Sequence, residues 1–293
     1  VGNALGLGFL EYMKIMWLPT IVAIFSNFIL LYLFFKKKLN NNFKLKHNSK
    51  FSVKNWFKAI TSTTLLIAML TTLITSQKFN IPIWIVTYTF ALIFIADDIL
   101  FGLYYTIKNR LSFEAKLTKN KQKIFKLHDI QEHRYEFWTT IKRIPWKIFP
   151  FIFVFFVLMA GLNIYGVVDW LATIISQIST TPARSIATNG ILGFILANII
   201  NNQPMTILMS NILLSDSLQT SMLAFRGGAY SIVIASNLGA NLTLIGALAG
   251  LMWKKILKTK GLEISYIEFL KTGIIITPIV FILSLLTLYF VLT

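Results

Sequence analysis

The sequence predicts an all-α polytopic membrane protein with about six transmembrane helices, one re-entrant hairpin and one broken helix. Of its 293 residues, 56% are hydrophobic and only 13% are charged, whereas a soluble domain carries about 25% charged residues. Several apolar runs are close to the length of about 20 residues that crosses a bilayer core. Two further apolar runs are interrupted by polar residues and helix breakers, and paired interruptions of this kind are typical of the binding sites of secondary transporters.

The charged residues have an uneven distribution along the chain. There are 28 Lys and Arg residues against 11 Asp and Glu residues, giving a net charge of +17, and most of the cations lie in the segments 36–54, 108–147 and 254–260. Such cationic loops are cytoplasmic by the positive-inside rule and attract anionic lipid. Because the cations are confined to loops between apolar runs, the basic balance predicts contact with membrane lipid and argues against nucleic-acid binding.

The chain contains no cysteine. Disulfides, thiolate metal sites and thiol catalysis are therefore excluded within it. In the largest polar stretch, His128, Asp129, Glu132 and His133 have a spacing that fits no standard zinc motif. We therefore predict no resident metal, no cofactor and no enzymatic activity.

Three crossings are predicted before the linker 108–147. These are Ile15–Phe35, with Pro19 as the place of a kink, Phe57–Ser76 and Ile81–Ala96. Asp97 and Asp98 then mark the interface; as intramembrane carboxylates they could serve a proton relay, although a pair that reaches toward the headgroups is the simpler interpretation. Residues 99–107 are predicted to form a short helix in the membrane plane.

The second part of the chain continues with a crossing at Phe149–Val168. Trp170–Ile178 has amphipathic spacing and is expected to lie along the outer surface. A last crossing is predicted at Ile274–Leu292. With the broken helix described below, six crossings and one outer hairpin place all three cationic loops on the same face.

The first interruption is Asn201-Asn202-Gln203-Pro204, which lies between the apolar stretches 190–200 and 205–214. Unpaired polar groups in hydrocarbon cost several kcal/mol, so they persist at membrane depth only where they line a buried site or a wet cavity. Pro204 removes a backbone donor and disfavours the helical conformation at Gln203. The pattern predicts a re-entrant hairpin over 188–215; the alternative is a polar loop that caps an ordinary helix at the surface.

The second interruption covers residues 236–246 inside a broken helix predicted over 228–253. Gly239 and Gly246 allow backbone conformations closed to other residues. Asn237, Asn241 and Thr243 supply side-chain donors and acceptors. The alternative interpretation is tight packing of small residues against a neighbouring helix.

These residues carry a resemblance to a known family. The segment around Asn201, Asn202, Pro204 and Thr206, and the run 239–246 followed by Leu251-Met252-Trp253, resemble the arsenite efflux permeases (arsenical pump membrane proteins) of the ion transporter superfamily. Residues 9–37 and 144–146 agree with this family, so the likeness extends over essentially the whole chain. It implies a fold of two inverted repeats, of which this chain is expected to carry the second and only the tail of the first, as an N-terminally incomplete member.

The resemblance also implies a domain organisation and a site. Residues 1–107 would end the first repeat with connecting helices, 108–147 would form a basic cytoplasmic linker, and 148–293 would form the second repeat. Gln203, Ser236 and Leu244 depart from the pattern expected for the family. The predicted substrate-binding residues are Asn201, Asn202, Gln203, Pro204 and Thr206 in the hairpin, and Asn237, Gly239, Asn241, Thr243 and Gly246 in the broken helix.

Arsenite at neutral pH is an uncharged trihydroxide, and its natural partners are neutral groups that both donate and accept hydrogen bonds. Between Ser185 and Trp253 only Asp216 and Arg226 are charged. The function that the resemblance implies, and with which these neutral groups agree, is efflux of arsenite or antimonite across the plasma membrane. For the energy source, the resemblance implies proton antiport or a soluble arsenite-stimulated ATPase as partner. The alternative is a sodium-coupled or proton-coupled anion or dicarboxylate transporter of the same superfamily.

Overall fold

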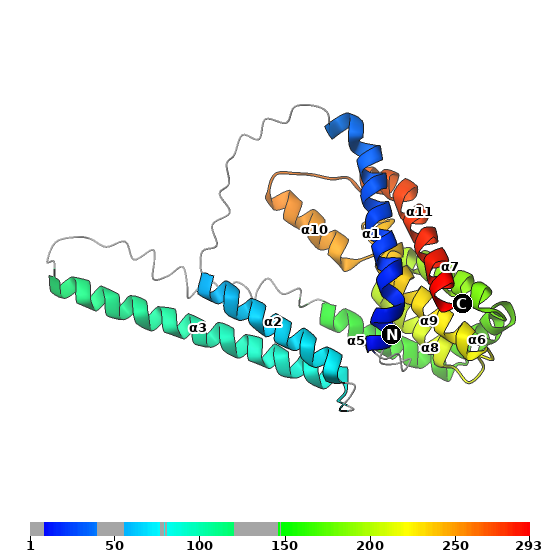
Figure 1. Ribbon diagram of the computed structural model, residues 1–293, viewed down its shortest axis with the longest axis horizontal. Helices are drawn as coiled ribbons and strands as arrows, with labels where there is room; N and C mark the ends of the chain where they lie inside the picture. The colour runs from blue at the N-terminus through cyan, green and yellow to red at the C-terminus, as the bar shows by residue number, and fades with distance from the viewer. Residues whose placement is uncertain (1–8, 40–55, 77–78, 80, 120–145, 147) are drawn as a thin grey trace. The chain divides into compact units, whose positions relative to one another are not determined.

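The computed structural model describes residues 9–39, 56–76, 79, 81–119, 146 and 148–293. Its elements within these residues are all helices (Figure 1), with no strand among them. The residues His128, Asp129, Glu132 and His133, interpreted above as no zinc motif, lie outside the described residues. The chain divides into two compact units, His47–Pro150 and Val1–Lys46 together with Phe151–Thr293.

The smaller unit is a pair of helices, α2 (Trp56–Ser76) and α3 (Ile83–Lys119). Lys58 lies 2.6 Å from a carboxylate oxygen of Asp97 and 2.5 Å from one of Asp98. α3 continues through the two aspartates as one helix, so the separate helix predicted over 99–107 is not present. Lys58 balances the carboxylates inside the helix pair, and the single glycine that follows, Gly102, does not end a helix by itself.

The larger unit contains the other helices. These are α1 (Phe9–Leu39), α5 (Ile148–Ile164), α6 (Val167–Ile178), α7 (Pro182–Ile200), α8 (Asn202–Leu214), α9 (Met222–Asn237), the short 3₁₀ helix η2 (Gly239–Asn241), α10 (Leu248–Thr259) and α11 (Tyr266–Leu292).

Five of the described helices are long and apolar enough to cross a membrane, and a sixth crossing is possible if α5 and α6 form one span. The five are segments of α1, α2, α3, α7 and α11. α5 and α6 are bent by 73°, because the chain turns at Gly166, which has a φ of 69°. The predicted crossing Phe149–Val168 therefore ends early, at Ile164. The prediction of an all-α polytopic membrane protein is confirmed.

The core of the larger unit is the contact between α7 and α9. The Ser185 hydroxyl donates to the carbonyl oxygen of Ala224 over 2.6 Å. A Cβ at Gly228 would lie 2.9 Å from Asn189 Nδ2, so glycine is what allows the two helices to approach so closely. Tyr230, two residues later on α9, is fully buried, with its ring 6.3 Å from that of Tyr12 in α1. Small-residue packing, the alternative considered for the broken helix, thus describes its first half.

α11 closes the larger unit against α1, with Ala23, Ile276 and Val280 buried between them. α11 begins at Tyr266, about two turns before the predicted start at Ile274. The Ser265 hydroxyl accepts a hydrogen bond from the backbone N–H of Glu268, and this N-cap starts the helix within a polar stretch.

Candidate functional site

In the first break, residues 201–204, the backbone changes direction at a single residue, Asn201. α7 ends at Ile200 and α8 begins at Asn202, while Asn201 between them has φ 76° and ψ 154°. It is the one residue other than glycine with a positive φ in the described part of the chain. Such a conformation costs about 1–3 kcal/mol and persists only where the surroundings impose it.

The Asn201 side chain is bonded at both ends. Its Oδ1 accepts a hydrogen bond from the Gln203 N–H over 3.3 Å, and its Nδ2 donates to the carbonyl oxygen of Ile245 over 3.0 Å. The first bond caps α8 and the second reaches the broken helix. Both bonds help to hold the strained backbone in place.

Pro204 lies in a different place from the one expected. The sequence interpretation put the turn just before Pro204, with Gln203 outside the helix, but both residues lie in the first turn of α8. The first four N–H groups of a helix have no partner within it, so a proline there loses nothing. Pro204 is buried and Gln203 is exposed.

The second break, residues 236–246, joins the end of α9 to α10 through η2 and a turn. A Cβ at Gly246 would overlap the carbonyl oxygen of Ala240 and lie 2.8 Å from Asn198 Oδ1. A Cβ at Gly239 would lie 3.0 Å from Cδ2 and 3.1 Å from Cα of Phe194. Only glycine permits these approaches, so both predicted glycines have a steric role where the second break meets α7.

The two breaks are bonded directly to each other. The backbone N–H of Asn202 donates to the carbonyl oxygen of Gly246 over 2.9 Å, and its Nδ2 donates to that of Ser236 over 3.1 Å. Thr206 Oγ1 lies 3.0 Å from Ser236 Oγ and 2.7 Å from the carbonyl oxygen of Asn202. Carbonyls left open where α9 ends are therefore satisfied by the hairpin, as buried backbone requires.

Asn198, one turn before the first break, is central to this contact, and the sequence interpretation missed it. Its Nδ2 donates to the carbonyl oxygens of Phe194 and Gly239, each over 2.8 Å. Its Oδ1 accepts from the Thr243 hydroxyl over 3.0 Å, and that hydroxyl accepts from the Gly246 N–H over 3.0 Å. A signal was present, because Asn198 is the only polar side chain in the run 191–200, and a lone amide in an apolar helix needs partners.

The structure brings the predicted residues together in two groups. In the first group, side-chain hydrogen bonds connect the two breaks or connect them to α7; these residues are Asn201, Asn202, Thr206 and Thr243. Gln203, Asn237 and Asn241 have exposed side chains instead. The Asn237 Nδ2 donates within α9 to Val233 O, and the Asn241 Nδ2 donates to Asn237 O. Among the described residues, no hydrogen bond reaches the side-chain carbonyl oxygens of Asn237 and Asn241.

The junction carries no formal charge. Of the two charged residues between Ser185 and Trp253, Arg226 pairs with Glu11 at 3.0 Å, and Asp216 follows the end of α8. In the part of the chain that the structure describes, no group of three or more His, Cys, Asp or Glu side chains could hold a metal ion. The chemistry that the junction offers is hydrogen bonding by neutral amides and hydroxyls.

Comparison with known proteins gives consistent matches. Residues 123–292 match the family model described as arsenical pump membrane protein. Proteins of that name from Escherichia coli and Shigella flexneri are each 26% identical over 282 residues, which is 94% of this chain and 58% of theirs. One from Yersinia enterocolitica is 30% identical over 141 residues, 47% of this chain and 32% of its own. The chain thus spans under two thirds of these relatives. No solved structure gives a significant match.

Proposed function

This chain belongs to the arsenical pump membrane protein family, and from that premise we propose that it forms part of a permease that exports arsenite or antimonite. It is a multi-pass protein of the plasma membrane. The activity and the solute are our proposal, because the relatives that carry this name are longer than the chain.

One observation carries the proposal: two interrupted helices meet through neutral amides and hydroxyls. Asn198, Asn201 and Asn202 link the two breaks, while no charged side chain belongs to either break. An uncharged trihydroxide needs neutral donors and acceptors, whereas an anion is usually held by Arg, Lys or a bound cation. The neutral junction therefore supports arsenite over a dicarboxylate.

The mechanism follows from how the two breaks are held. Asn201 and Asn202 keep the end of α7 against the second break, so the amides of Gln203, Asn237 and Asn241 can face a solute without reorganising. Interrupted helices at a transporter site allow one group of helices to rock against another around a fixed site. We propose that the protein acts as a permease without enzymatic activity, driven by proton antiport or by a soluble ATPase partner.

The test is arsenite export by the protein, expressed together with any sequence that precedes it in its gene, in a bacterial strain that lacks arsenite efflux. We expect higher arsenite tolerance and faster loss of arsenite from preloaded cells than with an empty vector. An uncoupler that abolishes the loss would support proton antiport. If the protein reaches the membrane in normal amount and cells retain arsenite as the vector control does, the proposed function is wrong.

A further inference from the structure

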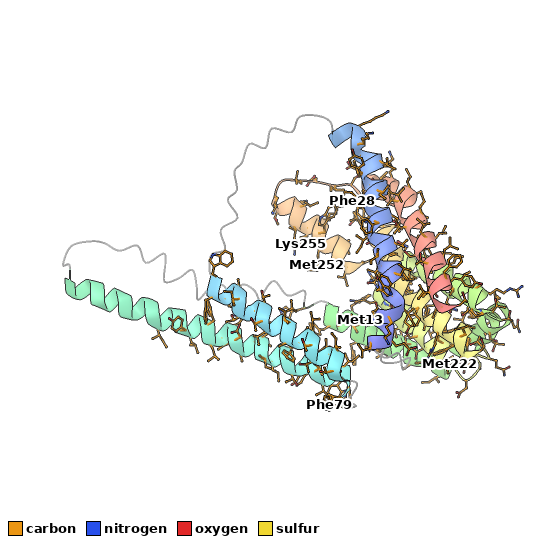
Figure 2. All side chains as sticks on the ribbon, viewed as in Figure 1. Met13, Phe28, Phe79, Met222, Met252 and Lys255 are labelled. Atoms are coloured by element: carbon orange, nitrogen blue, oxygen red, sulfur yellow. The ribbon has the colours of Figure 1, made fainter. Side chains whose placement is uncertain are left out.

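A cavity lies between α1, α9 and α11, next to the second break. Its volume is about 300 Å³, at the lower end of the range for pockets that bind small molecules. Asn237 lines it and also belongs to the second break. The other walls include Thr20 of α1, the helix on which Figure 2 labels Met13 and Phe28, and Ser284 of α11. No Asp, Glu, Lys or Arg lines this cavity.

The hydroxyls of Thr20 and Ser284, two of the residues that line this cavity, use their protons within their own helices. The Thr20 hydroxyl donates a hydrogen bond to the carbonyl oxygen of Met16 over 2.7 Å, and the Ser284 hydroxyl donates one to the carbonyl oxygen of Val280 over 2.8 Å. Each hydroxyl has only one proton, which is already committed to the hydroxyl's own helix. Any further hydrogen bond to either oxygen must therefore be one that it accepts.

Asn237 adds a third acceptor. Its Nδ2 donates to the carbonyl oxygen of Val233 over 2.9 Å. A backbone carbonyl can only accept, so the orientation of the amide is fixed and Oδ1 is the end left for the cavity. Pro19, which also lines the cavity, has no N–H, so the carbonyl of Ile15 lacks its usual helical donor.

We infer that this cavity binds a small, uncharged solute through the solute's own hydroxyl groups. A solute that donates several hydrogen bonds satisfies the acceptors of Thr20, Asn237 and Ser284, and Tyr12 supplies a hydroxyl that can donate in return. An anion of similar size would place its own acceptor oxygens against the acceptors of the cavity, and no cation that lines the cavity would balance its charge. The chemical class is a neutral polyhydroxide, such as a protonated metalloid acid.

This inference rests on the proposed function and deepens it, because it adds a cavity and residues of α1 and α11 to the site. Thr20 and Ser284 lie outside both breaks and belong to elements that sequence reasoning did not connect with binding. Asn237 joins the cavity to the second break. A solute bound here would touch the end of α9, where the helix is interrupted.

The experiment measures initial rates of arsenite uptake into inside-out proteoliposomes that contain the purified complete protein. Thr20→Val and Ser284→Ala remove one acceptor each with little change in volume. We expect each to raise the KM for arsenite about three- to tenfold, the loss of one hydrogen bond, with the maximal rate nearly unchanged. Antimonite, another neutral hydroxide, should compete with arsenite, and arsenate should not.

Matched controls are Ser26→Ala on α1 and Thr287→Val on α11. These hydroxyls make the same kind of bond to their own helices, to Val22 O and Leu283 O, but do not line the cavity. If the cavity variants behave as these controls do, or if arsenate competes as well as antimonite, the inference is wrong. If the unchanged protein takes up no arsenite, the proposed function fails instead. Equilibrium dialysis of antimonite against the same variants then decides whether the cavity binds it.

Discussion

The hydroxyl groups of α2 and the amides around the two breaks are both polar groups within apolar sequence, but they make different bonds. In α2, Thr64 and Thr71 donate to the carbonyls of Ile60 and Ile67, four residues earlier. Around the breaks, Asn198 donates to the carbonyl of Gly239, 41 residues away, and Asn201 to that of Ile245, 44 residues away. Hydroxyls in α2 are satisfied inside one helix, whereas the amides join two interrupted helices.

This difference shows which polar residues build tertiary structure in a membrane protein. The hydroxyl of a threonine in a continuous helix can donate a hydrogen bond to a carbonyl of the preceding turn, and it then needs no partner from another element. An interrupted helix leaves carbonyl and N–H groups without partners, and each costs several kcal/mol in an apolar surrounding. Asn side chains, which both donate and accept, satisfy those groups. Substitution of a polar residue near a break should therefore lower the free energy of unfolding more than substitution of a threonine within a continuous helix.

The largest expected effect comes from Gly246→Ala. The new methyl group would overlap the carbonyl oxygen of Ala240, and rigid backbone on that side leaves no cheap adjustment. We expect the free energy of unfolding to fall by about 3 kcal/mol. Unfolding in detergent, followed by circular dichroism, measures the loss.

A matched control for this variant is Gly161→Ala in α5, where a Cβ meets no atom within 4 Å. Alanine favours a helix over glycine by about 1 kcal/mol, so this variant should be as stable as the original or more so. Equal stability of the two alanine variants would contradict the tight fit of the two breaks.

The second prediction concerns Asn198→Leu. Leucine removes the donor to Gly239 O and the acceptor for Thr243, which leaves both partners without those bonds. An unsatisfied buried polar group costs about 1–3 kcal/mol, and Asn198 is only partly buried, so we expect a loss of about 2 kcal/mol. The same detergent unfolding measures it, and Asn211→Leu, whose amide bonds only to Ile207 O of its own helix, is the control.

Sequence alone predicted the membrane class, the helical fold and the family, and these are confirmed. The approximate positions of most helices could be found because apolar runs and breakers are local features. Gly239 and Gly246 were singled out for the backbone conformations that glycine allows, but neither has a positive φ, and the structure gives both a role in close packing instead. The binding role of the ten predicted site residues and the three-part division of the chain stay predictions.

What the sequence could not supply depends on contacts between distant residues. α3 continues beyond Asp97, whose carboxylate bonds to Lys58, 39 residues earlier. The position of the turn at Asn201 depends on its bond to Ile245. The role of Asn198 depends on Gly239 and Thr243 being brought to it by the packing of α7 on α9. A sequence pattern relates each of these residues only to its neighbours in the chain.

The third prediction concerns the ionic contact in the smaller unit. Lys58→Met keeps the aliphatic stem but leaves the carboxylates of Asp97 and Asp98 without this cation. The side chains of Lys58 and Asp97 are each 24% exposed and that of Asp98 is 55% exposed. Because water screens part of the charge, we expect a loss of only about 1 kcal/mol. The double variant Lys58→Met with Asp97→Asn should recover part of this loss, and no recovery would contradict the pairing.

The smallest effect is expected for Thr71→Val in α2. Valine has nearly the shape of threonine, and the hydroxyl it lacks bonds only to Ile67 O within the same helix. Because that carbonyl keeps its place in the helical ladder and the side chain is exposed, the stability should change by less than about 0.5 kcal/mol. Detergent unfolding beside Asn198→Leu makes the test. If Thr71→Val were as damaging as Asn198→Leu, bonds within one helix would matter as much as bonds between breaks, and the contrast between the two regions would not hold.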